Sequence, residues 1–219
     1  MNIWIAIVMI LMMALVFTVG GFFLRLRLYR GLSAQIARGE AAAALERLEG
    51  FWARAVLSPY ARERLCFLAL AGAASADAAG TKDLVASFNA LMKLQLQDAQ
   101  RAEALSDGFH AFAARRDSAH VRRILQEMKQ GGFTAAQLAA YRRHADVVCL
   151  GCGERYRTQL ESTYATLSGR RRGYAAYLLA SIYGRAHDER AAAMSAEAQH
   201  LLGLSADTID RSIHVCTTF

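Results

Sequence analysis

The sequence contains almost no proline and no alternating run of β-branched residues. Pro59 is the single proline in 219 residues, and valine, isoleucine and threonine do not alternate with polar residues as they do in strands. Alanine, the strongest helix former, supplies about a fifth of the chain, whereas proline is the strongest helix breaker. The composition therefore predicts an all-α protein and argues against fold classes built on β-sheets.

Cysteine is also scarce. The four cysteines, Cys66, Cys149, Cys152 and Cys216, are irregularly spaced in a chain of ordinary length. Small secreted domains that depend on disulfides carry more cysteines in a shorter chain. The pattern therefore favours free thiols in a reducing compartment.

No acidic residue precedes Glu40, whereas Arg25, Arg27, Arg30 and Arg38 follow a hydrophobic segment. The formal net charge is +7, and beyond one further run of three arginines the charges are nearly balanced. A nucleic-acid-binding domain carries a broad basic stripe, so we expect no nucleic-acid partner. Arg25, Arg27 and Arg30 are instead expected to contact anionic lipid headgroups and to set the topology.

The hydrophobic segment covers residues 3–24 and contains no charged residue. A helix of this length spans roughly 33 Å, which suffices for a hydrocarbon core of about 30 Å. Trp4 lies at one edge and Tyr29 just beyond the other, where aromatic side chains favour the membrane interface. The segment and its basic flank, residues 1–30, therefore predict a single-pass transmembrane anchor.

A cleaved signal peptide and a buried core helix are the alternatives for this segment. A signal peptide has a positive n-region, a shorter apolar stretch and a small-residue cleavage site, and a long core helix has a polar face. The segment has none of these features. Because the arginines follow the segment, the positive-inside rule places the bulk of the chain in the cytoplasm.

The remaining chain reads as helices joined by short Gly, Asp and Ser turns. Hydrophobic residues recur at three- and four-residue spacing, as for Ala44, Leu45, Leu48, Phe51 and Trp52, which are expected on one face of a helix over residues 40–55. The other expected helices begin at Ser58–Pro59 and cover residues 83–96, 98–115, 118–130, 135–141, 156–167, 173–185 and 188–202, with the segment 73–83 as a turn. Short loops favour antiparallel neighbours. We therefore expect an antiparallel helical-hairpin solenoid or bundle over residues 31–203 and a C-terminal tail over 204–219.

The last pair, residues 177–198, contains the clearest motif, YLLASIYGRAHDERAAAMSAEA. Small and aromatic residues recur at fixed spacing there, at Leu179, Ala180, Tyr183, Asp188, Ala192 and Ala196. This pair resembles a tetratricopeptide (TPR) repeat. The resemblance implies that Ala180, Ala192 and Ala196 pack where two helices approach closely and that the domain binds another protein.

A weaker copy of the motif places Phe112, Val121 and Leu125 at similar offsets. The likeness covers about a third of the chain, and an irregular helical bundle stays open as the alternative. An N-terminal anchor followed by TPR-like helices is similar to bacterial membrane-anchored assembly or quality-control adaptors.

Cys149 and Cys152 form a CxxC pair, which can supply half of a zinc site or a redox dithiol. Zinc needs two further ligands, for which His144, His187 and His200 are candidates. A redox CxxC follows a strand, and the neighbouring glycines favour a tight turn instead. We expect two incidental cysteines in a loop, with no metal or other cofactor, and a zinc or dithiol module stays open as an alternative.

No histidine combines with a serine or cysteine and an acid in the order of a catalytic triad, so we expect no catalytic residues and no enzymatic activity. The arginines at 170–172 lie at a helix start, where the helix dipole disfavours them. These arginines could contact lipid or an acidic partner, or they could lie in a solvated turn, and the sequence leaves both alternatives open. The last four residues match a prenylation box only formally.

The leading hypothesis is a membrane-anchored, non-enzymatic scaffold or adaptor. Another protein or peptide would lie in a groove lined by the first helix of each pair. Tyr174, Tyr177 and Tyr183 are the candidate groove residues, and Tyr183 is equally compatible with an internal position. A structural membrane protein that forms a homo-oligomer is a further alternative.

Overall fold

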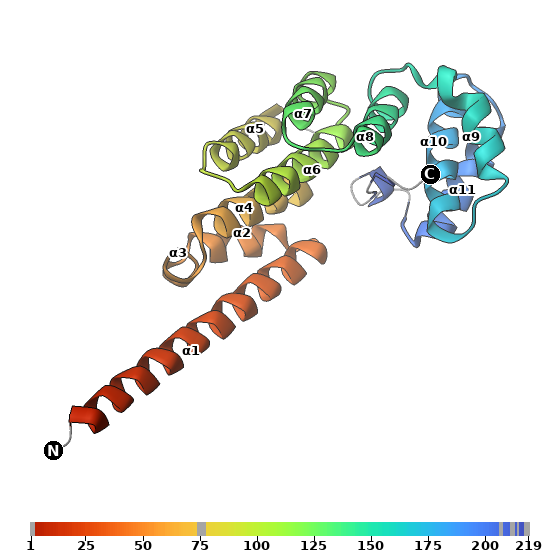
Figure 1. Ribbon diagram of the computed structural model, residues 1–219. Coiled ribbons are helices and arrows are strands. Elements are labelled where there is room, and N and C mark those ends of the chain that lie inside the picture. Colours follow the sequence, from red (N-terminus) through yellow and green to blue (C-terminus); the bar gives the residue numbers. More distant parts are fainter. Residues whose placement is uncertain (1–2, 74–77, 206–207, 211–212, 214, 217–219) are drawn as a thin grey trace. The chain divides into compact units, whose positions relative to one another are not determined.

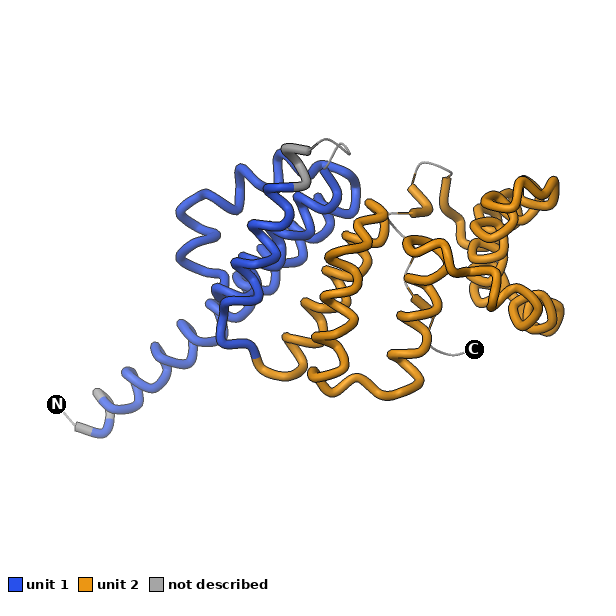
Figure 2. The backbone as a smooth tube through the Cα atoms, turned by 90° about the horizontal axis from the view of Figure 1, so that it is seen from above, with its two compact units in different colours: residues 1–96 blue, residues 97–219 orange. Residues whose placement is uncertain are grey.

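The computed structural model describes residues 3–73, 78–205, 208–210, 213 and 215–216. Every regular element in this part of the chain is a helix, as the composition predicted (Figure 1). The chain divides into two compact units, unit 1 (Met1–Leu96) and unit 2 (Gln97–Phe219), which Figure 2 shows in different colours. This division differs from the expected anchor, single domain and tail, because the end of the anchor helix packs within unit 1 and residues of the expected tail pack within unit 2.

Unit 1 contains five helices in the described residues. They are α1 (Ile3–Ala37), α2 (Ala41–Glu49), α3 (Phe51–Val56), α4 (Pro59–Ala73) and α5 (Ala78–Met92). Among the described helices, α1 is the one that is long and apolar enough to cross a membrane, with a mean hydropathy of 2.6 in its most apolar window. The helix ends at Ala37, and Gly39 then adopts a φ of +81°, a conformation that favours glycine.

The helix expected over residues 40–55 is divided in two at Gly50. Gly50 has an extended ψ of 155°, so α2 ends before it and α3 begins after it. Ala44 and Leu48 on α2 are buried as expected, but Phe51 and Trp52 on α3 are 74% and 67% exposed. The prediction that all these residues share one buried face is therefore wrong for the two aromatic residues, because the break at Gly50 changes the direction of the face.

The core of unit 1 is apolar and includes the buried rings of Phe67 and Phe88, whose centroids lie 5.4 Å apart. One buried cluster within it is aliphatic and consists of Leu32, Ala44, Leu48, Ala53, Leu57 and Leu65, from α1 to α4, with the partly buried Leu28, Tyr29, Ile36, Ala61 and Cys66 packed against it. The backbone N–H of Ala61 donates to Ser58 Oγ at 3.2 Å, so Ser58 caps α4 as predicted. The last turns of α1 are thus part of the core of this unit.

Unit 2 begins with α6 (Asp98–Ala114), α7 (Ser118–Gln130) and α8 (Ala135–Val148). The N-terminal caps predicted for α7 and α8 are confirmed, because Asp117 accepts from the His120 N–H and Thr134 from the Gln137 N–H. A short 3-10 helix, η1 (Gly153–Tyr156), leads into α9 (Arg157–Tyr164), and α10 (Gly169–Arg185) and α11 (Arg190–Leu202) follow.

Several boundaries differ from the expectation, among them the ends of α5, α8 and α9 and the starts of two helices. The helix α5 begins at Ala78, inside the expected turn 73–83, of which residues 74–77 lie outside the described residues. The helix α10 begins at Gly169, so the arginines at 170–172 occupy its first turn. The hydrophobic pattern alone does not mark either start.

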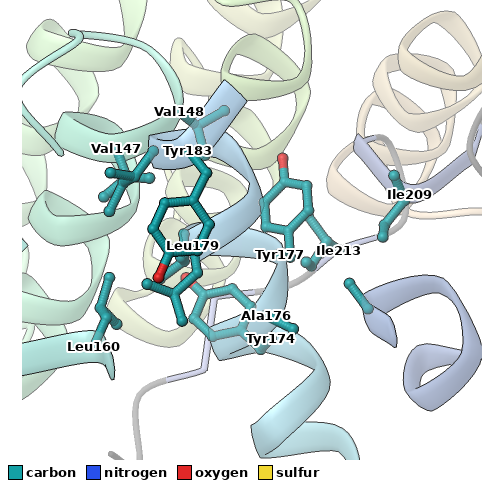
Figure 3. Packing of buried hydrophobic residues seen from close by; sticks show 13 residues of the cluster. Val147, Val148, Leu160, Tyr174, Ala176, Tyr177, Leu179, Tyr183, Ile209 and Ile213 are labelled. Carbon is teal, nitrogen blue, oxygen red and sulfur yellow. The ribbon is translucent and has the colours of Figure 1, made fainter. Parts of the chain in front are cut away.

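The core of unit 2 contains tyrosine as well as aliphatic residues. Figure 3 shows Tyr174, Tyr177 and Tyr183 among residues of α8, α9, α10 and the segment after α11. Ile209 and Ile213 are buried in this cluster, and the backbone N–H of Val215 donates to His110 Nε2 at 3.0 Å. Ile209 and Ile213 of the expected tail therefore belong to the core of unit 2, while residues 217–219 of the formal prenylation motif lie outside the described part.

Candidate functional site

A groove of about 540 Å³ lies over α10 and α11 in unit 2. Small residues at Ala180 and Gly184 on α10 face Ala191 and Ala192 on α11, so this part of the groove has short side chains. Polar side chains also line it, namely Ser181, Ser195, Gln199, Arg116, Arg185 and Asp210. Ser181 and Arg185 lie on α10 and Ser195 and Gln199 on α11, two helices that pack against each other, whereas Arg116 and Asp210 come from outside this pair.

Two arginines and one aspartate give the groove its charge. Arg185 Nη2 donates to the carbonyl oxygen of Val148 at 2.6 Å, which holds the guanidinium against the last turn of α8. Arg116 lies in the turn between α6 and α7 with a φ of +55°, outside the usual backbone regions of a residue other than glycine. Positive side chains thus outnumber negative ones in the lining.

Asp210 accepts a hydrogen bond of 2.8 Å from the hydroxyl of Tyr177. Burial, followed by the negative charge of Asp210, raises the pKa of Tyr177, so its phenol stays protonated and remains a donor. The Tyr177 ring is only 6% exposed, and it reaches the groove through this bond. Tyr177 therefore fixes the Asp210 carboxylate in place.

The structure corrects the expected location of the three tyrosines. Tyr174, Tyr177 and Tyr183 are 2%, 6% and 4% exposed, so their rings belong to the core and not to an open groove face. The Tyr174 hydroxyl pairs with His144 Nδ1 at 2.9 Å, and the two rings are stacked. Burial, followed by the nearby His110, lowers the pKa of His144 to about 3, so this histidine is neutral.

Tyr183 is covered by two arginines. The Cζ atoms of Arg190 and Arg157 lie 4.2 Å and 5.4 Å from the centre of its ring. Its hydroxyl donates to Glu161 Oε1 at 2.6 Å, and burial, followed by this hydrogen bond, raises the pKa of Tyr183 to about 12. Hydrogen bonding to Arg190 lowers the pKa of Asp188, in the turn before α11, to about 2. These charges hold the turn together and leave the tyrosine no free polar face.

The small residues expected between the helices of the last pair lie elsewhere. Leu179 is buried, Ala180 is partly buried, and Ala192 and Ala196 are exposed. The close approach of α10 and α11 is at Gly173 instead, where an added Cβ would lie 2.9 Å from Leu201 Cβ and 3.0 Å from Leu202 Cγ. The expectation that Ala192 and Ala196 pack between two helices is therefore wrong, and Ala192 lines the groove.

The CxxC pair does not have the environment of a reactive dithiol. Burial raises the pKa of the Cys149 thiol to about 11, and its Sγ lies 3.7 Å from the carbonyl oxygen of Ala113. Cys152 is exposed, and Gly151 between them has a φ of +72°, which is typical of a tight turn. Among the described residues no group of three or more His, Cys, Asp and Glu side chains is placed to hold a metal ion.

The other arginines named from the sequence lie in two settings. Arg25, Arg27 and Arg30 are exposed on α1. Arg172 pairs with Glu197 at 2.7 Å and lies over the ring of Tyr164, whereas Arg170 and Arg171 are exposed. A contact within unit 2 is thus the observed role of Arg172.

Sequence reasoning missed the polar residues of the groove. Arg116, Arg185 and Asp210 are far apart in the chain, and no motif connects them. The available signal was the recurrence of small residues at Ala180, Gly184 and Ala191 in successive helices. Comparisons with protein-family models, curated proteins and solved structures found no match for the chain.

Proposed function

We propose that this chain is a single-pass, membrane-anchored and non-enzymatic adaptor that holds a segment of another protein in the groove over α10 and α11. The observation that carries the proposal is the groove itself, which combines small residues with two arginines and one aspartate. Short side chains let the backbone of a bound segment come close. The arginine guanidinium is a planar donor suited to carboxylates.

The chemistry of the groove favours an acidic segment. Asp210 already accepts the Tyr177 hydroxyl, so its charge is partly satisfied within unit 2. Arg185 uses Nη2 for the Val148 carbonyl and keeps its other donors. A glutamate or aspartate of the partner would pair with Arg116 or Arg185, while its backbone lies over Ala180 and Gly184.

A TPR-like arrangement is the repeat architecture that we propose for α10 and α11. The two helices pack against each other, and residues of both line one concave surface, as in helical repeats that bind peptides. In this proposal the groove is formed by small residues, with the tyrosines behind it in the core. This changes the partner-binding residues from Tyr174, Tyr177 and Tyr183 to the groove lining.

Site-specific crosslinking tests this function. A photoreactive residue at Ser195, which lines the groove, should capture another protein in native membranes. Ala192→Leu should abolish the capture, because the larger side chain fills the groove. Ala193→Leu is the matched control, since Ala193 is an exposed neighbour outside the groove lining. Both changes should alter stability by less than about 0.5 kcal/mol, because they replace one exposed good helix former with another.

Three results would contradict the adaptor function. Equal capture by the two leucine variants would mean that the captured protein does not bind in the groove. Capture of only a second copy of this chain would favour a self-associating membrane protein. Bound zinc that is lost on Cys149→Ser would favour the metal module.

Membrane topology has its own test. We propose that the apolar part of α1 crosses the membrane and that its arginine-rich flank places the chain after it, residues 31–219, in the cytoplasm. Cys152 is exposed, whereas Cys66 and Cys216 are partly buried and are therefore weaker reporters. A variant with Cys152 as its only cysteine should resist a membrane-impermeant maleimide in intact cells and react after permeabilisation. Labelling of intact cells would refute this orientation.

A further inference from the structure

The short helix α3 presents two large hydrophobic side chains to solvent. Phe51 and Trp52 are 74% and 67% exposed, and outside α1 no other described large hydrophobic residue is classed as exposed. The two rings touch edge to face, with centroids 5.7 Å apart. Exposure of two aromatic rings to water is unfavourable, and such exposed apolar patches commonly mark a surface that binds another apolar group.

The opposite side of α3 fixes its position in unit 1. Ala53 is 1% exposed and Leu57, directly after the helix, is 8% exposed, and both belong to the aliphatic cluster of unit 1. The helix packs against α1 as well as α4. Phe51 and Trp52 are therefore held on a supported helix beside α1.

A niche of about 330 Å³ lies where α1 meets the start of α4. Its lining is mostly apolar and comes from both elements, namely Phe22, Arg25, Leu26, Tyr29, Leu57, Ser58 and Ala61. Phe22 belongs to the uncharged segment 3–24, and Arg25 is the first charged residue after it. The niche therefore lies at the level where the apolar part of α1 gives way to the basic part.

Two of the polar groups in this lining already have partners within unit 1. The Tyr29 hydroxyl accepts from Arg64 Nη1 at 3.3 Å, and Ser58 Oγ accepts from the backbone N–H of Ala61. Arg25 is exposed, and it makes no ion pair with any residue that the structure describes. The positive charge at the niche is thus available to a ligand, and no acidic residue precedes Glu40 to compensate it.

We infer that α3 and this niche form an interfacial site for an anionic phospholipid. Phe51 and Trp52 insert at the boundary between headgroups and acyl chains, the region that aromatic side chains prefer. One acyl chain lies against Phe22 and Leu26, and Arg25 binds the lipid phosphate. The inference rests on the proposed insertion of α1 in a membrane, because this insertion brings the bilayer surface to the niche.

The position of the niche beside α1 favours a bilayer lipid over another protein as its occupant. A lipid beside an inserted α1 is already present at high local concentration, and it meets the niche without a further binding event. It supplies both chemistries that the lining requires, an apolar chain and a negative headgroup. A bound protein would instead have to displace that lipid.

Tryptophan fluorescence tests the inference directly, since the chain contains only Trp4 and Trp52. The full-length Trp4→Phe protein, with Trp52 as its single reporter, is placed in phosphatidylcholine vesicles containing phosphatidylglycerol. Brominated phospholipid should strongly quench Trp52, its emission should shift to the blue, and aqueous iodide should have little effect. Emission typical of water, quenched by iodide and unaffected by brominated lipid, would overturn the inference.

The Trp52→Phe protein separates this result from the membrane proposal. Its remaining Trp4 reports on α1. Quenching of Trp4 by brominated lipid without quenching of Trp52 would refute the α3 site and leave the anchor standing. A failure of both tryptophans to respond would refute the anchor and the site together.

The role of Arg25 is tested with brominated phosphatidylglycerol as a minor component of phosphatidylcholine vesicles. Enrichment of this lipid around Trp52 should fall about tenfold or more in Arg25→Ala, because a charge-assisted hydrogen bond to the phosphate is lost in addition to the roughly fivefold attraction that any one arginine near an anionic surface contributes. Arg27→Ala is the matched control, since Arg27 is exposed on the same helix and does not line the niche. Equal losses in the two variants would indicate general attraction to the surface and would contradict a phosphate bound at Arg25.

Discussion

The two units are all helical, but different interactions stabilise their cores. Unit 1 has a leucine and alanine cluster around Leu65 and the buried rings of Phe67 and Phe88. The cluster in unit 2 instead contains three tyrosines whose hydroxyls bind His144, Asp210 and Glu161. All six histidines lie in unit 2, and both tryptophans lie in unit 1. We therefore expect unit 1 to respond mainly to loss of buried volume, and unit 2 to respond also to pH and to loss of single polar groups.

The largest effect is expected from a cavity in unit 1. Leu65 is fully buried in its cluster, and Leu65→Ala should lower the free energy of unfolding by about 2–5 kcal/mol. Urea titration followed by Trp52 emission in the Trp4→Phe background measures this loss in the unit that contains the mutation. Leu68→Ala, at a partly exposed position of the same helix, is the control and should cost less. Equal costs would show that the cluster around Leu65 is not the centre of this unit.

The next effect concerns the close approach of α10 and α11 in unit 2. Gly173→Ala places a Cβ within 3.0 Å of Leu201 and Leu202, so it should destabilise unit 2 by about 1–3 kcal/mol. Gly184→Ala on the same helix meets nothing within 4 Å and should be neutral or stabilising by up to about 1 kcal/mol. Urea titrations followed by circular dichroism compare the two variants. An unchanged urea midpoint in Gly173→Ala would mean that α10 and α11 do not approach closely at this residue.

The pH dependence distinguishes the units most directly. The folded pKa of His144 is lowered to about 3 from 6.5, because burial opposes the charged form. Below pH 6.5 the unfolded chain binds a proton at this residue and the folded chain does not, so stability is complete above that pH and falls towards pH 3 by about 1.4 kcal/mol per unit. Urea titrations at pH 6.5 and 5.5 should show this loss in tyrosine emission, since six of the eight tyrosines lie in unit 2, while Trp52 emission in the Trp4→Phe background should show almost no loss in unit 1.

Two variants isolate the contribution of His144. His144→Gln should reduce the pH dependence of unit 2, although it also lowers stability at neutral pH by removing a stacked ring. His200→Gln should keep the dependence, because His200 is exposed. A slope that survives in His144→Gln would assign the titration to another group.

The smallest effect concerns one hydroxyl. Tyr183→Phe keeps the ring beneath Arg157 and Arg190 but removes the hydrogen bond to Glu161, so unit 2 should lose about 0.5–1.5 kcal/mol. Urea titration at neutral pH is the measurement. An unchanged midpoint would mean that the hydroxyl contributes no net stability in unit 2.

The helices of both units could be predicted because their signals are local. Ser58, Asp117 and Thr134 cap helices through bonds to residues three positions later, and such spacing can be read from the sequence. The break at Gly50 could not be predicted, because the residues from Ala44 to Trp52 have the spacing of one continuous amphipathic helix. The consequence was an incorrect buried position for Phe51 and Trp52.

The candidate site was less predictable than the helices. The buried state of Tyr177 depends on a residue after α11, Asp210, and the groove depends on Arg116 and Arg185 from separate parts of unit 2. Helical periodicity identifies the face of one helix that is buried, but it does not specify which distant residue covers that face. Only the small residues Ala180 and Gly184, which lie one helical turn apart on α10, could be identified from the sequence as part of the site.

The continuity of α1 has a mechanical consequence. This helix has 35 residues, roughly 52 Å in length, and its last turns carry the fully buried Leu32 into the core of unit 1. If α1 crosses a bilayer as proposed, helices α2 to α5 of unit 1 are fixed to the end of a stiff helix and are not connected to it by a flexible linker. A change in bilayer thickness that tilts α1 would then turn these four helices through the same angle. A force that pulls on them would likewise act on Leu32 before it could draw the apolar segment out of the membrane.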